Sequence, residues 1–185
     1  MEHILQKSAL KDLFTYEDYK HLPNDGKRYE IIEGELLISP SPKTGHQRIH
    51  ARLFNALMNF VQKNHSGELF SAPLDVVFSN LNVVQPDLLF ISKKRRSIIA
   101  EDNIRGAPDL IVEILSPYTE KADRIQKKEL YAVYGVREYW IADPEKETIE
   151  VYSLSAEGYR LSGTFEKTDR LQSVILKGFE INLFN

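Results

Sequence analysis

The sequence predicts an α/β (α+β) fold, in which a mixed β-sheet core is flanked by helices and extended by extra antiparallel strands at the C-terminus. Three observations predict this class. Residues 108–144 have the pattern of strand, helix and strand, an order that implies two parallel strands joined by a helix. Residues 28–42 have the pattern of a hairpin, which adds antiparallel pairing beside that unit. After residue 144 the chain continues as short β-rich runs.

The first expected elements are a short helix and the hairpin. Residues 15–23 predict the helix, with Thr15 as its N-cap and Pro23 beyond its end. Within residues 28–42, two β-rich runs flank Glu33-Gly34 and stop at prolines. This pattern predicts a hairpin with its turn at that dipeptide.

A long helix is expected next, from Thr44 to about Asn64. Thr44 and Gln47 have the capping-box spacing, in which each side chain satisfies an otherwise unpaired backbone N–H. Apolar residues then recur at helical spacing and give this helix one apolar face. They are Ile49, Leu53, Ala56, Leu57, Phe60 and Val61.

The remaining elements are strands and one further helix. The strands are expected over residues 68–78, 83–92, 109–115, 137–143 and 148–154. The third of them is apolar on both faces, which favours a central, buried strand. The helix is expected over residues 119–134, with Gly135 as its left-handed terminator.

At 185 residues the chain is most simply one domain, and its 42% hydrophobic and 28% charged residues are typical of a globular protein. It contains no cysteine, which excludes disulfides, cysteine-based zinc sites and a cysteine nucleophile. Its first residues lack the pattern of a signal peptide, and no run approaches the roughly 20 apolar residues of a membrane span. These features predict a cytoplasmic protein with no membrane partner.

The charge of the chain limits how it can meet nucleic acid. A net charge of −3 argues against a protein that coats nucleic acid, but not against one that grips it locally beside a bound cation. The compact basic run is Lys93 to Arg96. We interpret this run as a solvated loop in preference to a phosphate-binding patch.

Two acids lie inside apolar strands, where a carboxylate is unfavourable unless it is paired, protonated or bound to a cation. Alternation puts Asp87 on one strand face with Leu89 and Ile91, and Glu113 on one face with Ile111. If the two strands are neighbours, the acids can share a divalent cation such as Mg²⁺, which prefers oxygen ligands. The alternative is that each acid lies near a strand end and meets only solvent or a backbone N–H.

The helix after Glu113 adds a lysine. On a 3.6-residue period, Lys127 lies on the flank between Tyr131 and Tyr134, whereas Lys128 is expected at the solvated surface. A flanking ammonium can turn inward to hold a phosphate oxygen or the attacking water, and partial burial is expected to lower its pKa. The alternative is that this lysine merely packs its methylenes. The residues expected on or near the core-facing side are Ala122, Ile125, Glu129, Leu130 and Val133.

Segments along most of the chain are similar to the Uma2 family, a bacterial group of nucleases in the PD-(D/E)xK, or restriction-endonuclease-like, superfamily. The similar segments are RYEIIEGEL, GHQRI, APLDVVF, NVVQPDLLFIS, GAPDLIVEILSP, KKELYAVYGVREYWIADP and FEINLF. The resemblance implies a restriction-endonuclease-like core and a single nuclease domain over residues 1–185.

The resemblance also implies roles for four residues. The metal-binding aspartate of the superfamily falls on Asp87, and the acid of its D/E-x-K element falls on Glu113. The sequence departs from the superfamily pattern at Leu115, which stands where the lysine is expected. In Uma2-like sequences the lysine is displaced to the following helix, at the position of Lys127. The upstream glutamate of the family is best placed on Glu30.

Other residues are weaker candidates. Glu33 and Glu35 are alternatives for the upstream glutamate, which could also simply pair with a lysine or arginine. His46 and His50 have the i, i+4 spacing of a shared metal site, but surface or capping roles are favoured, and a substrate contact of His46 stays open. Asp75 is either a further acid near the site or a partner for a backbone amide.

We therefore expect a metal-dependent endonuclease that uses Mg²⁺ or Mn²⁺. Asp87 and Glu113 are the expected metal ligands, and Glu30 is a further candidate catalytic residue. Lys127 is expected to orient the attacking water or to offset charge in the transition state. The expected partners are nucleic acid, first of all DNA, and a second copy of the chain in a homodimer. Two alternatives stay open: a catalytically silent nuclease-like module that binds nucleic acid or protein, and a hydrolase of another phosphoester.

Overall fold

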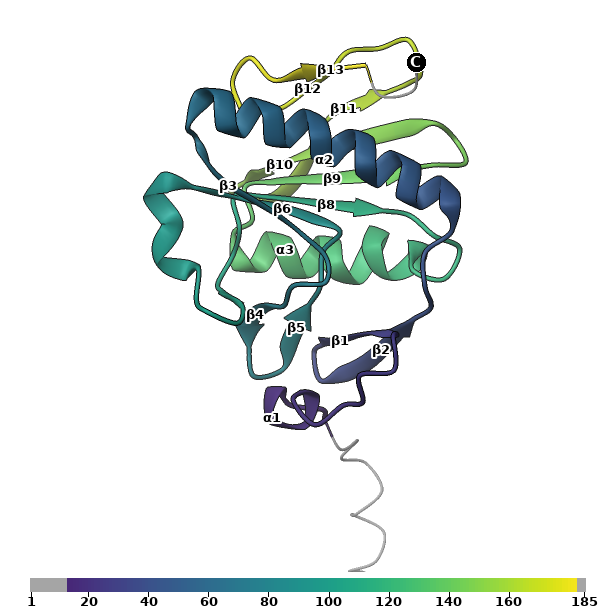
Figure 1. Ribbon diagram of the computed structural model, residues 1–185, viewed down its shortest axis with the longest axis vertical. Coiled ribbons are helices and arrows are strands. Elements are labelled where there is room, and N and C mark those ends of the chain that lie inside the picture. The colour runs from purple at the N-terminus through teal and green to yellow at the C-terminus, as the bar shows by residue number, and fades with distance from the viewer. Residues whose placement is uncertain (1–12, 183–185) are drawn as a thin grey trace, which may run out of the picture.

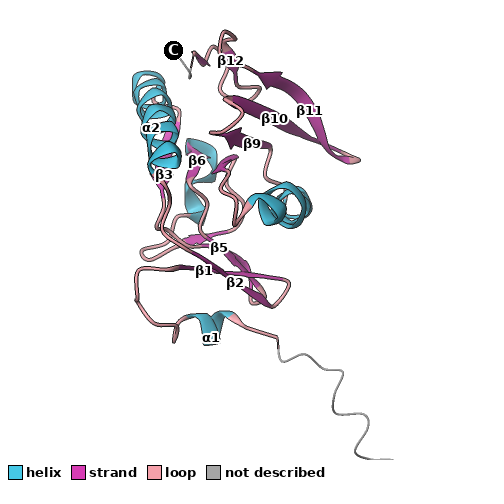
Figure 2. Cartoon of the chain, turned by 90° about the vertical axis from the view of Figure 1, so that its right-hand side faces the viewer, coloured by secondary structure: helices cyan, strands magenta, loops and turns pink. Residues whose placement is uncertain are grey.

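The computed structural model describes residues 13–182, within which the strands form a six-stranded sheet, a five-stranded sheet and a two-stranded ribbon. Helix α2 (Thr44–Asn64) lies on one face of the six-stranded sheet, and α3 (Lys128–Tyr134) lies on the other face (Figure 1, Figure 2). The predicted class, a mixed sheet flanked by helices, is confirmed.

The six-stranded sheet contains the predicted strand–helix–strand unit. From one edge to the other its strands are β11 (Gly158–Phe165), β10 (Thr148–Ser155), β9 (Glu138–Asp143), β8 (Leu110–Ile114), β6 (Leu88–Ser92) and β3 (Gly67–Ser71). Strands β8 and β9 pair in parallel, as a helical crossover between them requires, and the other pairs are antiparallel. The hairpin of β10 and β11 supplies the extra antiparallel strands expected at the C-terminus.

The five-stranded sheet begins with the predicted hairpin. Its strands, in spatial order, are β2 (Glu35–Ser39), β1 (Arg28–Ile32), β5 (Asn82–Val84), β4 (Val76–Ser79) and β7 (Ile104–Arg105). Strands β1 and β2 pair antiparallel around the expected turn. The smaller elements are α1 (Tyr16–Tyr19), the 3₁₀-helix η1 (Lys93–Ile98), the π-helix η2 (Ala122–Lys127) and the ribbon of β12 (Leu171–Gln172) and β13 (Glu180–Ile181).

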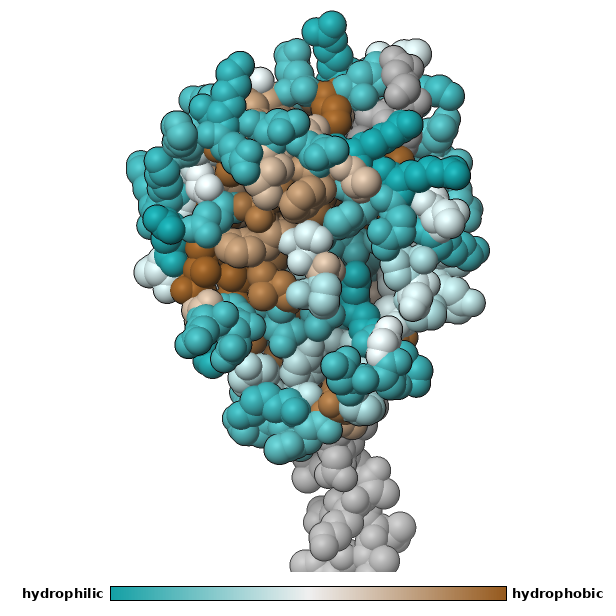
Figure 3. Space-filling view, in the orientation of Figure 1, coloured by the Kyte–Doolittle hydropathy of each residue, from teal (hydrophilic) through white to brown (hydrophobic). Residues whose placement is uncertain are grey.

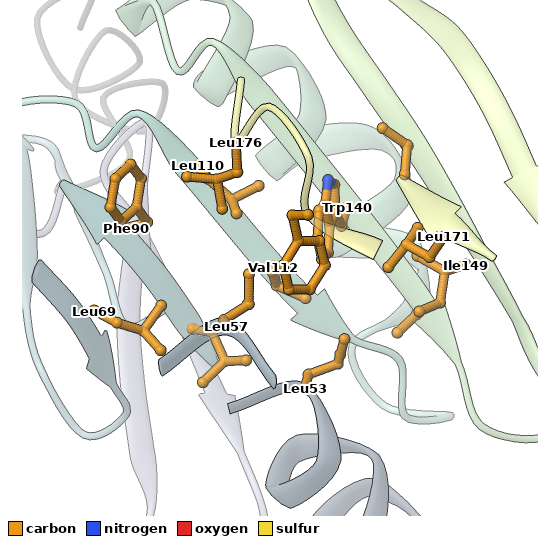
Figure 4. Close-up of a cluster of buried hydrophobic side chains, with 14 of the residues drawn as sticks. Leu53, Leu57, Leu69, Phe90, Leu110, Val112, Trp140, Ile149, Leu171 and Leu176 are labelled. Atoms are coloured by element: carbon orange, nitrogen blue, oxygen red, sulfur yellow. The ribbon is translucent and has the colours of Figure 1, made fainter. Parts of the chain in front are cut away.

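One layer of the core lies between α2 and the six-stranded sheet. Leu53 and Leu57 of α2 pack on the sheet face that carries Leu110, Val112 and Trp140 (Figure 4). All of these side chains are fully buried. The apolar face predicted for the long helix is therefore the one that covers the sheet.

The other face of the same sheet packs against α3. Ile111 of β8 lies there in one cluster with Leu130 and Tyr131 of α3. Because side chains alternate between faces along a strand, Glu113 points to this side, away from α2. The alternation of side chains along β8 therefore places the buried carboxylate of Glu113 on the side of α3.

The prediction of one continuous strand over residues 68–78 is wrong. It is divided into β3 and β4, which belong to different sheets. Pro73 stands between them and has no N–H for a strand ladder, while the N–H of Ala72 donates to the carbonyl of Asp87 at 3.2 Å. The chain therefore leaves one sheet at this point and enters the other.

Both early helices differ in detail from the prediction. The N-cap of α2 is Lys43, so the capping box expected from Thr44 and Gln47 is wrong. The Gln47 N–H donates to the Lys43 carbonyl at 3.1 Å, which makes Thr44 the first helical residue. Helix α1 is shorter than residues 15–23, but its expected N-cap is confirmed, because Thr15 and Asp18 form a reciprocal capping box.

Figure 3 shows an apolar area below α2 and beside η1, surrounded by polar side chains. The apolar area is part of the outer surface of the protein. No helix within residues 13–182 combines the length and the apolar character that a membrane crossing requires.

Gly67, the first residue of β3, lies against its neighbouring strand. A Cβ atom at this position would lie 2.1 Å from the carbonyl oxygen of Ile91, a backbone atom that cannot turn aside. We expect Gly67→Ala to lower the free energy of unfolding by about 1–3 kcal/mol or more, the usual range for overpacking. Urea unfolding measures this loss.

Gly45→Ala is the control, because a Cβ there meets only Pro144 at 4.0 Å and alanine favours the helix by up to about 1 kcal/mol. Equal stability of both variants would contradict the prediction.

Candidate active site

Two carboxylates come together where strands β6 and β8 stop pairing. The strands are antiparallel neighbours, with Leu88 opposite Val112. One residue further along this register, Asp87 stands opposite Glu113. Both side chains are buried, at 2% and 1% exposure, and both line the same cavity. The structure thus places the two predicted acids side by side, on the face of the sheet that α3 covers.

Asp87 is held by three partners. Arg28 Nη1 donates to Oδ1 at 2.9 Å, and the N–H of Ile114 donates to Oδ2 at 2.8 Å. His46 Nε2 lies 3.0 Å from Oδ2. Burial alone would raise the pKa of Asp87, but the hydrogen bond with His46 and the charge of Arg28 outweigh burial and hold this pKa well below its usual range. Asp87 is therefore ionised and fixed in orientation.

Glu113 has the opposite electrostatic environment. Lys127 Nζ at 3.2 Å and Tyr131 Oη at 2.7 Å both donate to its Oε1. Among the described residues, none donates a hydrogen bond to Oε2. Burial raises the pKa of Glu113 to about 8, although the charge of Lys127 acts in the other direction. One acid of the pair is thus held as a carboxylate, and the other tends to keep a proton.

Lys127 lies in the middle of a group of carboxylates. Its Nζ is 2.9 Å from Glu30 Oε2, 3.2 Å from Glu113 Oε1 and 3.2 Å from Asp123 Oδ1, and the residue is 1% exposed. Burial acts to lower the pKa of Lys127, but the three carboxylates raise it well above its ordinary value. The expectation of a lowered pKa is therefore wrong, and Lys127 is a permanent cation.

Lys127 is buried at the end of the π-helix η2. In a π-helix the backbone bonds run from i to i+5, which widens the turn and shifts the phase of the residues that follow. Asp123, in the same segment, is buried as well. A 3.6-residue period gave the wrong core-facing side at three positions. Ile125, Glu129 and Val133 are exposed, the first by 50% and the last by 81%.

Glu30, on β1, forms an ion pair with Lys127. It is 2% exposed, whereas Glu33 and Glu35 are at the surface. Its Oε1 accepts the N–H of Gln85 at 2.8 Å, and its Oε2 forms the ion pair with Lys127. Glu30 is not among the described residues that line the cavity. The upstream glutamate thus contacts the lysine without reaching the cavity.

The cavity between the acids is small and adjoins a larger one. Its volume is about 40 Å³, which suits an ion or a few water molecules. Asp87, Glu113 and Lys127 line it. A cavity of about 450 Å³ lies alongside and shares His46 and Ser116 with it. A bulky substrate therefore has room beside the small cavity rather than inside it.

Sequence reasoning missed Asp123. This residue is 1% exposed and lines the small cavity together with the predicted acids. Burial raises the pKa of Asp123, while the charge of Lys127 and the side chain of Thr119 act in the other direction. The available signal was its position four residues before Lys127, which puts both side chains on one side of the helical segment.

The remaining candidates lie outside this group. His50 Nε2 is 3.1 Å from Ser71 Oγ, so the two histidines of α2 have different partners. Asp75 accepts hydrogen bonds from Tyr19 Oη at 2.6 Å and from Gln85 Nε2 at 2.8 Å. Within residues 13–182, Gln85 links this carboxylate to Glu30, because its side chain donates to Asp75 and its N–H donates to Glu30.

The basic run of η1 is also remote from the two acids. It follows β6 at the end opposite to Asp87. Arg96 pairs with Glu68 at 2.8 Å, and Arg95 lies 3.8 Å from Asp109. These arginines therefore serve local ion pairs.

The donor set of the site fits a hard divalent cation. Its four carboxyl groups outnumber its two fixed positive groups, and the charge of a bound cation would favour their ionised forms. The donors are all oxygens, the ligands that Mg²⁺ and Mn²⁺ prefer. Within residues 13–182, no three acidic or histidine side chains are arranged to hold an ion by themselves. This arrangement suits Mg²⁺, which binds through one or two carboxylates and keeps several waters. The carboxylates are those of Glu30, Asp87, Glu113 and Asp123, and the positive groups are Arg28 and Lys127.

Comparisons with known proteins identify a family and a similar fold. The model of the Uma2 family, described as "Putative restriction endonuclease", matches residues 16–183. A solved structure described as a "putative nuclease belonging to DUF820 from Anabaena variabilis ATCC 29413" is similar in fold, with a TM-score of 0.77 and 21% sequence identity. The similarity covers 92% of this chain and 97% of that chain. No curated protein matches the sequence.

Proposed function

Because the chain belongs to the Uma2 family, we propose that it is a metal-dependent endonuclease that hydrolyses phosphodiester bonds in nucleic acid. One observation carries the proposal most directly. Asp87, Glu113 and Lys127 come from separate elements and line one small cavity. A buried group of four acids around two cationic side chains is unfavourable for a fold unless it serves a purpose such as cation binding.

Asp87 and Glu113 would hold Mg²⁺ or Mn²⁺ in the proposed site. Three partners occupy three of the roughly four acceptor directions of the Asp87 carboxylate, which leaves it one direction for a cation. Glu113 offers Oε2, since its two hydrogen-bond donors both use Oε1. When bound, the cation supplies Lewis-acid polarisation of the phosphate and lowers the pKa of a coordinated water.

Lys127 brings fixed positive charge to the reacting phosphate. Its raised pKa excludes a role as a general base at neutral pH. A preorganised cation in a site that excludes water stabilises the charge that develops on the phosphate oxygens. Glu30 and Tyr131 hold the parts of this arrangement in place, since Glu30 pairs with Lys127 and Tyr131 donates to Glu113.

The proposal includes DNA as the first substrate to test and a homodimer as the acting form, because a cut across both strands needs two such cavities. The alternative is a catalytically silent module that keeps the fold and binds nucleic acid or protein. The two readings differ in one measurable respect: whether the purified chain cleaves nucleic acid when a divalent cation is added.

Metal removal is therefore the decisive experiment. We expect cleavage of a labelled nucleic acid with Mg²⁺ or Mn²⁺ and a drop of about 10³-fold or more with excess chelator, because the cation supplies several kcal/mol of transition-state stabilisation. The panel contains single-stranded and double-stranded DNA and RNA. Restoring Mn²⁺ after chelation should restore the rate. Binding of Mn²⁺ without cleavage of any of these substrates would favour the silent module.

A further inference from the structure

Asp123 has a carboxylate oxygen without a hydrogen-bond partner among the described residues. The residue is 1% exposed, and its Oδ1 is buried and accepts no hydrogen bond. Lys127 Nζ lies 3.2 Å away as an ion-pair partner. A buried carboxylate oxygen that has an ion-pair neighbour but accepts no hydrogen bond is incompletely satisfied, so it has the capacity to accept a further donor.

The backbone of Asp123 is fixed while its side chain faces the cavity. Its N–H donates to the Thr119 carbonyl at 2.9 Å, and its carbonyl accepts the hydroxyl of Tyr139 at 3.0 Å. The side chain lines the cavity of about 40 Å³ together with Asp87 and Glu113. The unpartnered oxygen therefore belongs to the side chain that faces the proposed cation site, and the cavity has room for water there.

Glu30 shows that pairing with Lys127 does not by itself produce this arrangement. Its carboxylate contacts the same ammonium, at 2.9 Å, but its other oxygen accepts the N–H of Gln85. It is not among the described residues that line the cavity. The two acids have the same charge and the same lysine, and they differ in access to the cavity.

A cation at this site needs acceptors for its water. Within residues 13–182 no three acidic or histidine side chains are placed to hold an ion alone, so a cation bound by Asp87 and Glu113 keeps coordinated waters. Each such water donates hydrogen bonds to a nearby acceptor. The unpartnered Oδ1 of Asp123 is an acceptor beside the same cavity.

We infer that Asp123 is an additional member of the cation site, whose Oδ1 accepts a hydrogen bond from a water of the bound Mg²⁺ or Mn²⁺. This inference rests on the proposed function, because it assumes that Asp87 and Glu113 bind the cation. In this arrangement the π-helix η2 contributes two groups to the site. They are the ammonium of Lys127 and the carboxylate of Asp123, which holds the hydrated cation.

The test is the affinity for Mn²⁺ alone, measured by titration calorimetry on the full chain at one pH without nucleic acid. Asp123→Ala removes the acceptor, and Glu30→Ala is the matched control, because it removes a carboxylate from the same lysine. Partners that act on a metal through its ligands typically contribute 10–100-fold in affinity. We expect a loss of about 10–100-fold for Asp123→Ala and of no more than a few-fold for Glu30→Ala.

Two outcomes overturn the inference alone. Asp123→Ala could bind Mn²⁺ as tightly as the unmodified chain, or its loss could equal that of Glu30→Ala, which would reduce the role of Asp123 to charge near Lys127. In either case, loss of Mn²⁺ binding in Asp87→Ala would still support the proposed function. If the unmodified chain binds no Mn²⁺, the inference and the metal dependence fail together. Should circular dichroism show Asp123→Ala unfolded, Asp123→Asn and Glu30→Gln replace the pair, with the same difference required.

Discussion

Replacing Lys127 with methionine is expected to lower nucleic-acid cleavage by about 10²–10³-fold, the usual loss when one preorganised charge at a reacting group is removed. It is also expected to lower the free energy of unfolding by about 3–5 kcal/mol, because it leaves buried carboxylates without their partner. Glu30, Glu113 and Asp123 all lie within 3.2 Å of the ammonium, and all are almost completely buried.

The destabilisation of Lys127→Met should depend on pH. Without the ammonium, burial raises the pKa of Glu113 and of Asp123 with no opposing charge from a lysine, so the folded state binds more protons than the unfolded chain. Stability then falls as pH rises, since the unfolded state is favoured wherever it binds fewer protons. Glu113 already behaves this way, with a pKa of about 8, so its contribution is full below the unfolded pKa and is lost as pH rises through about 8. Urea unfolding at pH 5 and pH 8 should show the larger deficit at pH 8.

Lys128→Met is the matched control for this lysine. Its Nζ lies 3.7 Å from the centre of the Tyr152 ring, a cation–π contact on the side away from the cavity. Its loss should lower stability by about 0.5–1 kcal/mol and leave cleavage unchanged. If Lys127→Met retained the stability and cleavage rate of this control, neither the buried ion-pair group nor the proposed role of Lys127 would stand.

Replacing Asp87 with asparagine is the second change with a large expected effect. Cleavage should fall by at least about 10²–10³-fold, since the variant loses a ligand of the proposed cation. Stability at pH 7 should fall by about 1.5–3 kcal/mol, the range for a hydrogen bond to a charged group, because Arg28 and His46 lose an ionised partner.

The stability that Asp87 contributes depends on pH with a sign opposite to that of the contribution of Glu113. The folded-state pKa of Asp87 is lowered, so its stabilisation is present above the unfolded pKa of about 3.9 and is lost as pH falls through the folded-state value. The stability difference between Asp87→Asn and the unmodified chain should therefore be constant from pH 7 to about pH 5 and shrink in more acidic solution. Urea unfolding at pH 7 and pH 3 measures it.

Asp109→Asn separates stability from cleavage. Asp109 is fully buried at the other end of β8, where it accepts the N–H of Ser92 at 2.8 Å and Arg137 Nη1 at 3.2 Å. Its partners resemble those of Asp87, an arginine and a backbone N–H, but it is not among the described residues of the cavity. We expect a similar loss of stability with normal cleavage. Equal loss of cleavage in both variants would remove the reason to assign Asp87 to the metal.

The sequence predicted the parts of the site that depend on strands. The apolar run of β8 made the burial of Glu113 visible. Alternation placed Asp87 on the matching face, although the strand expected over residues 83–92 is divided into β5 and β6 and Asp87 lies just before β6. A strand has a fixed period of two, so the direction of each side chain follows from its position. Of the three glutamates near the first hairpin, the one at position 30 is the one that faces inward, as the resemblance implied.

The helical part of the site was harder to predict. A 3.6-residue period cannot represent the π-helix η2, so the exposure of Ile125 was misjudged, and Lys127, expected on the flank with partial burial, is almost completely buried. Asp123 was missed because a polar residue in an amphipathic helix is usually solvated, and only the tertiary structure shows that its face is closed. The raised pKa of Lys127 likewise depends on three carboxylates that are distant or unremarkable in sequence.

The ammonium of Lys127 lies within 3.2 Å of three carboxylates. A phosphate oxygen that met this ammonium in the proposed reaction would have to take the place of one of these internal partners. Glu113 would be the partner to give way, because a cation bound to its carboxylate would weaken its hold on the lysine. In the proposed enzyme, cation binding and the release of the lysine toward substrate would therefore be coupled through one carboxylate.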